Sequence, residues 1–355
     1  MGSASMSMNS KIVFSAFFLA CVLAAASARA ATCDMTGYKN SDGLSAAAAS
    51  DGVRVTWRGE DGNTLRAGFA IRNSQPVVTQ LAVRANGGNW IALADDVTPE
   101  FQVTTGERRI STAQMQYLKR THQDTPEEIE RRKWLTFWDA PLQVPGNPRW
   151  NAFLPRKTGE IRRGMSVYHT ANCRVSSEGT HLSVSFDGLA LGIFSGGIRF
   201  TVYQGSSLLR QEAIGKTSEP AAAYIYKAGL KGFAIKPDTK LTWRDNARGW
   251  QDEEFGGAVN QNPVNLRARN RLEVLGGGGG SLAVFPTPHQ FFFARENEVN
   301  LGYVYYRKDG SNSFSLGVMQ PEHGEGYKPW GISDAVWERR ARVSRLEPPG
   351  NLPPL

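Results

Sequence analysis

Residues 53–71 read VRVTWRGEDGNTLRAGFAI, two runs of alternating apolar and polar residues separated by a polar segment. In the first run Val53, Val55 and Trp57 occupy every second position. Successive side chains of a β-strand point to opposite faces, so this alternation is typical of a strand with one buried face. Residues 60–63, which include Gly and Asn, predict a turn before the second run at residues 65–71.

The same pattern recurs along most of the chain. Residues 86–88 (Asn-Gly-Gly) predict a hairpin, and the five glycines at 276–280 predict another, because a strand-like run follows them where a phosphate-binding loop needs a helix. Counting these runs predicts an all-β fold, a large antiparallel β-sandwich or super-sandwich with one or two short helices. The further candidate strands are 77–83, 90–93, 181–186, 198–203, 224–226, 241–244, 272–275, 282–285, 291–294, 301–306 and 314–318.

Helical signals are scarce. Thr125, Pro126 and Glu128 match an N-cap, a first-turn proline and a capping-box acid. The cations at residues 131–133 then fall late in the helix, where the macrodipole favours them. A second short helix is expected at residues 334–343, capped by Ser333.

The amino-terminal segment has the pattern of a secretory signal peptide. Residues 12–26 are apolar and uncharged, Lys11 precedes them, and Ala28-Arg29-Ala30 supplies a small-x-small cleavage site. The apolar run of 15 residues is shorter than the ~20 that span a bilayer as a helix. The sequence therefore predicts a secreted or periplasmic protein cleaved after residue 30, with an uncleaved anchor as the alternative. No other stretch is expected to cross a membrane.

The length of 355 residues accommodates one large or two medium domains. We expect a signal peptide at 1–30 and a β-sandwich region at 31–345, with possible sub-domains near 31–175 and 176–345. Residues 346–355 form a proline-rich tail. Signal cleavage would leave two cysteines, Cys33 and Cys173, and an exported protein would either pair them as a disulfide or keep two thiols.

The net charge does not by itself indicate nucleic acid. Cleavage removes Lys11 and Arg29 and no acid, which lowers the formal charge from +8 to +6. The remaining cations are dispersed among acids, so a nucleic-acid partner is not expected. An anionic polysaccharide or a negatively charged envelope surface suits the charge better.

Motifs for metals and cofactors are missing from the sequence. No HExxH, HxH or CxxC spacing occurs, and no glycine-rich dinucleotide or phosphate loop stands between a strand and a helix. We therefore predict no metal site and no cofactor.

Aromatic and polar residues cluster in the second half of the chain. Sugars bind to flat aromatic faces, while planar carboxylate, amide and guanidinium groups satisfy their hydroxyls. Loops above a sandwich would present such groups, although each aromatic taken alone is more often a core residue. The candidate ligand-binding residues are Trp243, Arg244, Asp245, Trp250, His289 and Trp330.

A catalytic reading would need a histidine beside a carboxylate for acid–base chemistry. The weak candidates are His169, His181, Glu322, His323 and Glu325, and a solvated loop is the simpler explanation of the last three.

Two segments resemble a β-rich region of uncharacterised exported bacterial proteins. They are TWRDNARGWQDEEFGGAVNQNPVNLRARNRLEV (242–274) and GGSLAVFPTPHQFFFARENEVNLGYVYYRKDGSNSFSLGV (279–318). In those proteins a metal-dependent PHP-type hydrolase domain follows this region. The resemblance covers roughly residues 180–345 and includes no catalytic motif, so it implies an accessory part without the metal centre. The strand pattern is also similar to galactose mutarotase-type super-sandwiches, a likeness of fold alone.

These observations lead to three hypotheses about function. The first is an exported protein that binds carbohydrate or an envelope glycan without catalysis of its own. The second is a carbohydrate-active epimerase, lyase or hydrolase that uses a histidine and a carboxylate. The third is a structural or protein-interaction module, expected if the aromatics are buried and no pocket forms.

Overall fold

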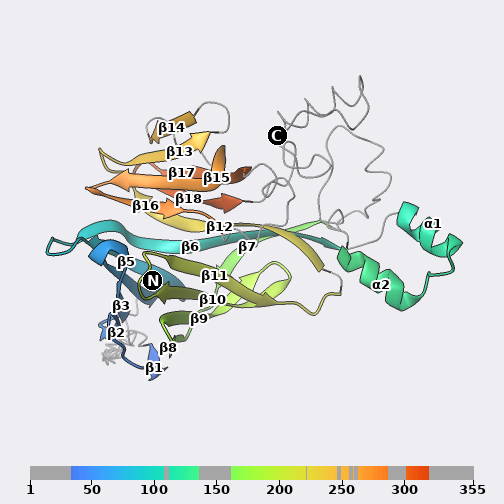
Figure 1. The fold of residues 1–355 in the computed structure, drawn as a ribbon, viewed down its shortest axis with the longest axis horizontal. Coiled ribbons are helices and arrows are strands. Elements are labelled where there is room, and N and C mark those ends of the chain that lie inside the picture. Colours follow the sequence, from blue (N-terminus) through green and yellow to red (C-terminus); the bar gives the residue numbers. More distant parts are fainter. Residues whose placement is uncertain are drawn as a thin grey trace, which may run out of the picture.

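The computed structural model describes residues 33–107, 112–135, 161–220, 222–245, 249–255, 259, 263–286 and 301–319. Strands dominate these residues, and the predicted all-β sandwich class is confirmed. Two helices, α1 (Thr112–Arg120) and α2 (Pro126–Leu135), extend away from the sheets on one side (Figure 1).

The first half of the described chain contains ten strands. They are β1 (Asp34–Gly37), β2 (Leu44–Ala49), β3 (Gly52–Arg58), β4 (Thr64–Arg72), β5 (Gln75–Arg84), β6 (Ile91–Glu107), β7 (Arg162–Tyr168), β8 (Cys173–Glu178), β9 (His181–Leu191) and β10 (Phe194–Tyr203). The second half contributes β11 (Leu209–Lys216), β12 (Ala222–Ala234), β13 (Lys240–Asp245), β14 (Gly249–Glu254), β15 (Val264–Gly277), β16 (Gly280–Val284), β17 (Leu301–Gly310) and β18 (Ser313–Met319).

The strands form three groups. Strands β2 to β5 and the first part of β6 make an antiparallel meander. A second group has the order β1-β8-β9-β10-β11, in which β1 pairs parallel to β8 and the other pairs are antiparallel. The third group continues from β6 through β12, β18, β17 and β15 to β13 and β14, with β16 beside β15. Figure 1 shows the third group above β6 and the second below it.

Strand β6 joins these groups. Its first residues, 91–97, pair with β5, and residues 98–107 pair with β12. Residues 102–105 also pair with β7 on the other edge, and the end of β7 pairs with β9. All three groups are therefore continuous through backbone hydrogen bonds.

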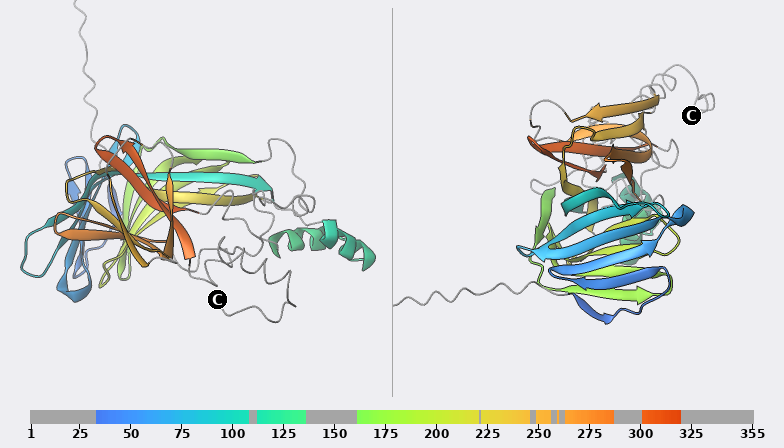
Figure 2. Two further views of the ribbon diagram at one scale, coloured as in Figure 1. Left: turned by 90° about the horizontal axis from the view of Figure 1, so that it is seen from above. Right: turned by 90° about the vertical axis from the view of Figure 1, so that its left-hand side faces the viewer.

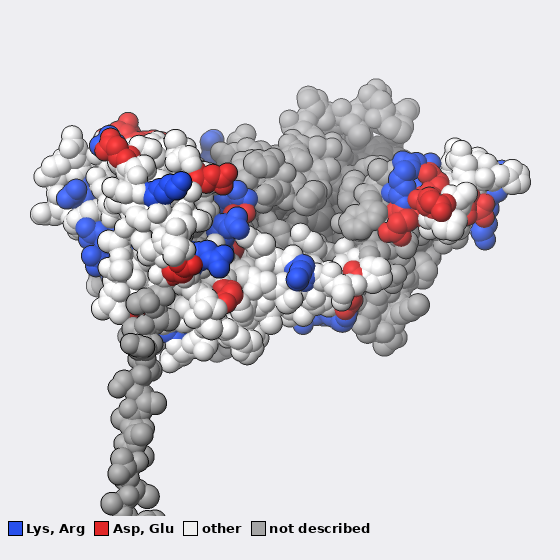
Figure 3. Space-filling model, turned by 90° about the horizontal axis from the view of Figure 1, so that it is seen from below, with Lys and Arg blue, Asp and Glu red and all other residues white. Residues whose placement is uncertain are grey.

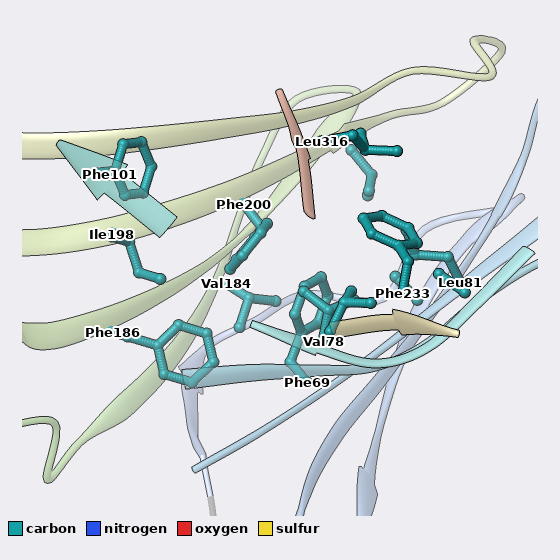
Figure 4. Close-up of a cluster of buried hydrophobic side chains, with 14 of the residues drawn as sticks. Phe69, Val78, Leu81, Phe101, Val184, Phe186, Ile198, Phe200, Phe233 and Leu316 are labelled. Atoms are coloured by element: carbon teal, nitrogen blue, oxygen red, sulfur yellow. The ribbon is translucent and has the colours of Figure 1, made fainter. Parts of the chain in front are cut away.

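The apolar face predicted for residues 53–71 lies in the core. Val53, Val55 and Trp57 are buried, as the alternation predicted. Phe69 of β4 meets the second group, because its ring centroid lies 4.8 Å from that of Phe200 on β10. Phe186 of β9 completes this contact at 6.2 Å from Phe200. Figure 4 shows these rings between the strands of the two sheets.

A second aromatic cluster lies within the third group. The ring of Phe314 stacks on Phe255 at 4.1 Å and on Phe233 at 5.3 Å. Tyr306 meets Phe255 edge-on at 5.1 Å. Both clusters belong to one continuous set of buried apolar side chains, so a single core serves all three groups.

The turns predicted from the sequence form where glycine and asparagine allow them. Residues 60–62 form a 3-10 turn between β3 and β4, and residues 86–88 lie between β5 and β6. Gly278 and Gly279 connect β15 to β16 with φ of +61° and +83°, the left-handed region that glycine tolerates. The glycine run is thus a hairpin connection, as predicted.

Helix α2 begins as the capping residues predicted. The backbone N–H of Glu128 donates to Thr125 Oγ1 at 3.3 Å. The Glu128 carboxylate accepts hydrogen bonds from Arg131 and Arg132, which lower its pKa to about 2. These cations therefore face a partner on their own helix. Helix α1 was not predicted, although residues such as Ala113, Met115 and Leu118 favour helix.

Several predicted strands prove longer than their apolar runs. Residues 90–93 were expected as a strand, whereas β6 has 17 residues. Residues 224–226 similarly belong to β12, which has 13. Pairing on both edges extends these strands through polar residues. The expected strand at 291–294, the helix at 334–343, the signal peptide at 1–30 and the tail at 346–355 lie outside the described residues.

The structure pairs Cys33 with Cys173. Their sulfurs lie 2.09 Å apart as a disulfide, which links the residue before β1 to the first residue of β8 across 140 residues of sequence. Strand β1 pairs parallel to β8 directly beyond this bond. The disulfide therefore supports a short edge strand of which Met35 alone is partly buried against the core.

Replacing Cys33 with serine should lower the free energy of unfolding by about 2–5 kcal/mol, because the closed loop is long. Denaturant titration checks this, and peptide mapping without reductant should recover the linked pair. Reduction of the wild-type chain should lower its stability to the level of Cys33→Ser. Equal stability of the oxidised, reduced and Cys33→Ser chains would contradict a structural disulfide.

Glu273 of β15 is a fully buried carboxyl group. It lies opposite Trp243 of β13 and Val284 of β16, and neither carboxyl oxygen has a hydrogen-bond partner of normal geometry among the described residues. Burial raises the pKa of Glu273 well above its ordinary value, and the nearby Gly317 backbone opposes this only in part. The folded chain therefore holds this carboxyl group protonated under conditions in which the unfolded chain ionises it.

Because the pKa of Glu273 is higher in the folded state, the destabilisation of the fold by this buried carboxyl group should be small at about pH 4. It should grow as pH rises toward 7. Glu273→Leu should therefore raise the free energy of unfolding by about 1–3 kcal/mol at neutral pH, and by less at acid pH. Glu273→Gln should also reduce the pH dependence. The exposed Glu254→Gln is the control, and a variant with the wild-type pH slope at position 273 would refute this account.

Candidate functional site

Strands β13 and β14 form a hairpin at the edge of the third group. Trp243 pairs with Gln251, Arg244 with Trp250 and Asp245 with Gly249. Strand β13 also pairs with β15, whereas no described strand pairs with the outer edge of β14. Four of the six residues predicted to bind ligand therefore lie on one small hairpin (Figure 1).

The sequence predicted a strand at 241–244, which β13 confirms, but it placed Trp250 in a loop, and this placement is wrong. Trp243, Arg244 and Asp245 belong to β13, and Trp250 belongs to β14. Residues 249–254 read GWQDEE, which resembles a loop in composition. Charged residues are nevertheless common on edge strands, because they discourage pairing with other chains.

One face of the hairpin points outward. Residues directly opposite each other in antiparallel strands share a face, so Trp250 stands beside Arg244. The Trp250 side chain is 66% exposed, the most exposed large hydrophobic residue among those described. Lys240 and Asp252 form an ion pair on the same face, and this contact raises the pKa of Lys240. The outward face thus combines a free indole ring with fixed hydrogen-bonding groups.

The other face of the hairpin points inward. Trp243 lies opposite Glu273 and packs against the core, so it is a structural aromatic residue. Leu241 is buried beside it, and Asp245 is half-buried. The predicted set of four is therefore divided by strand alternation: Arg244 and Trp250 are available to a ligand, whereas Trp243 and Asp245 face the sheet interior.

The other predicted residues do not join this hairpin in the described part of the chain. His289, Trp330, Glu322, His323 and Glu325 lie outside the described residues. His169 is exposed at the end of β7. His181 of β9 stands 3.6 Å from Glu178, between Nε2 and Oε2, but that carboxylate is 89% exposed, as expected of a surface pair.

Sequence reasoning missed a group of buried charges on β6, β17 and β18. Arg307 donates from Nη2 to Glu100 Oε1 at 3.0 Å and to Ser315 Oγ at 3.1 Å, and from Nε to Asp309 Oδ1 at 2.6 Å. Ser315 also donates to Asp309. These carboxylates raise the pKa of Arg307 despite its partial burial. Arg307 and Asp309 are two residues apart on one strand, so the sequence could have predicted that they share a face. Glu100 is distant in sequence, and its place beside them could not be predicted.

This charged group serves the structure. The adjacent cavity has a volume of about 10 Å³ and is lined by Gln102, Met165 and Tyr305 among others. Such a space holds one water molecule at most. Because each carboxylate is already engaged by Arg307, the group has neither the room nor the free acid and base that a substrate would need.

The described residues contain no group of three or more His, Cys, Asp or Glu side chains that could hold a metal ion. None of the described helices is long and apolar enough to span a bilayer. On the face shown in Figure 3, basic and acidic side chains are interspersed over the strands and the helices. Charge on this face is therefore mixed, as the sequence suggested.

The sequence did not predict a second surface, which is formed by arginines of the first group. Arg54, Arg66 and Arg84 lie on neighbouring strands of the first group, and Trp90 contacts Arg66 and Arg84. In the sequence each of these arginines stands at a polar position of an alternating run. Only the register between strands shows that they share a face.

A comparison of the sequence with protein-family models finds no match. A search of curated proteins likewise finds no similar sequence.

Proposed function

We propose that the chain binds carbohydrate on the outward face of the β13–β14 hairpin and that it acts as an exported glycan-binding sandwich protein. The observation that carries this proposal is the exposed Trp250 ring beside Arg244 on a paired strand. An exposed indole ring of this size is costly to leave in water, and it packs well against the C–H face of a sugar ring.

The polar groups around Trp250 supply the second requirement. Arg244 is exposed directly across from the ring, and Asp252 lies two residues along the same strand face. A guanidinium group donates paired hydrogen bonds to vicinal hydroxyls, and a carboxylate group accepts them. Because both residues stand on strands, the site is held without ordering a loop, and this lowers the entropic cost of binding.

Export and the relation to the accessory region of PHP-type proteins are parts of the same proposal. A disulfide between Cys33 and Cys173 suits an oxidising compartment. The chain would then present glycan to a partner enzyme or hold it at the cell envelope. No described histidine and carboxylate meet in a cavity, so a catalytic role has no specific observation in its favour.

Trp250→Ala should weaken binding to the best glycan on an array by at least about tenfold, because stacking and burial of the ring are lost. Isothermal titration measures the change. Trp250→Phe should retain part of the affinity, since a smaller aromatic face remains.

Tyr224→Ala is the matched control, because Tyr224 is an aromatic residue that is 49% exposed on β12, outside the hairpin. Its affinity should equal that of the wild type. Absence of binding to any glycan, or equal affinity of Trp250→Ala and wild type, would favour a structural or protein-interaction module and refute the proposal.

A further inference from the structure

The outer face of β3, β4 and β5 carries four arginines, which we call the arginine face: Arg54, Arg58, Arg66 and Arg84. The strand register places Arg58, Thr64 and Arg84 in one row across the sheet, and Arg66 in the next row between Thr56 and Ala82. Arg54 lies in the third row. Successive rows are about 6.8 Å apart along a strand. The right view of Figure 2 shows these strands at the front of the molecule.

Trp90 lies against two of these cations. The guanidinium carbon of Arg66 is 3.8 Å from the centroid of the indole ring, and that of Arg84 is 4.9 Å from it. The loop between β5 and β6 brings the tryptophan to this position. Cation–π contact holds a guanidinium group by its flat face and leaves its N–H edge available. The ring therefore orients these two arginines without neutralising their charge.

No carboxylate in the described part of the chain lies within ion-pair distance of these four arginines. By contrast, Arg72 at the end of β4 bridges Asp51 at 3.0 Å and Asp96 at 2.6 Å. Burial, with the nearby charges of Arg54 and Arg84, lowers the pKa of Arg66, and its buried Nε has no hydrogen-bond partner. Asp95 lies on the same side of the sheet, opposite Gln80 on β5. Like charges side by side on a sheet cost stability, so an external anion would relieve this arrangement.

A depression adjoins Arg54 at one end of the arginine face. It has a volume of about 430 Å³, and its lining includes Ser50, Asp51, Arg54, Gly68, Thr79 and Gln80. The Asp51 carboxylate is already paired with Arg72. A Cβ atom at Gly68 would collide with Thr79 Oγ1, so glycine at this position lets the Thr79 hydroxyl keep its place in the lining. The lining offers hydroxyl, amide and guanidinium groups and the Arg72-paired carboxylate of Asp51, beside a small apolar surface. This composition fits a sugar ring with an acidic substituent.

We propose that the arginine face binds an acidic polysaccharide, whose carboxylate or sulfate groups pair with Arg54, Arg58 and Arg84 while a sugar ring occupies the depression. Guanidinium groups bind both kinds of oxyanion through paired hydrogen bonds. Cations spread over three rows of an open face suit a chain that repeats its charge. Single-stranded nucleic acid is a poorer fit, because it needs free aromatic faces for stacking and Trp90 is occupied by arginine.

This site is separate from the β13–β14 hairpin. The test measures binding of the full chain to immobilised polygalacturonate, dextran sulfate and neutral dextran at low ionic strength. Wild type should bind at least one of the two acidic polymers and should not bind neutral dextran through this face. Arg54→Gln/Arg84→Gln should weaken binding by at least about tenfold, and added salt should weaken the wild type in the same way. Arg199→Gln/Lys216→Gln removes the same charge from exposed positions on β10 and β11 and should bind as wild type does.

The outcomes separate the two proposals and the two anions. Trp250→Ala should leave binding to the acidic polymers unchanged. If Trp250→Ala alone lost this binding and Arg54→Gln/Arg84→Gln kept it, the acidic polymers would bind at the hairpin and the inference would be overturned. Preference for polygalacturonate identifies a carboxylate ligand, and preference for dextran sulfate identifies a sulfate ligand; both support the arginine face. No binding to either polymer, equal loss in both double variants, or stronger binding of single-stranded DNA would overturn the inference. Thermal unfolding checks that each variant is folded.

Discussion

The pairing of β6 is the constraint on which the rest of the described structure depends. This strand hydrogen-bonds to β5 over its first residues, then to β12, and over four residues to β7 as well. Val97, Phe101 and Val103 are buried along it, so the apolar clusters of the three groups merge. A backbone group buried without a partner costs free energy, and each of these neighbours is therefore needed by the others.

This shared core also determines the state of the ionisable side chains buried in it. Arg307, Glu100 and Asp309 are partly or wholly buried, and their hydrogen bonds satisfy one another. Glu273 has no such partner and avoids ionisation instead. The two groups show the two ways in which a sheet interior accommodates a carboxyl group: a paired cation or a retained proton.

The two proposed binding surfaces lie where the core leaves sheet faces uncovered. The β13–β14 hairpin is an edge that presents Trp250 outward and Trp243 inward. The arginine face lies on the opposite side of β3, β4 and β5 from Val53, Val55 and Phe69. In both places strand alternation divides a strand into a structural side and a side available to ligands. Rigid strands then set the spacing of the exposed groups.

The sequence by itself determined the class of fold, because the alternation at Val53, Val55 and Trp57 depends only on the period of a strand. It also located turns such as Gly278-Gly279, where the backbone requires glycine. Only the tertiary structure decided that β14 is a strand, that Trp243 is internal, and that Arg54, Arg66 and Arg84 share a face on which Trp90 contacts Arg66 and Arg84. Local alternation says which residues share one strand's face. Register between strands arises from long-range pairing, and no single segment encodes it.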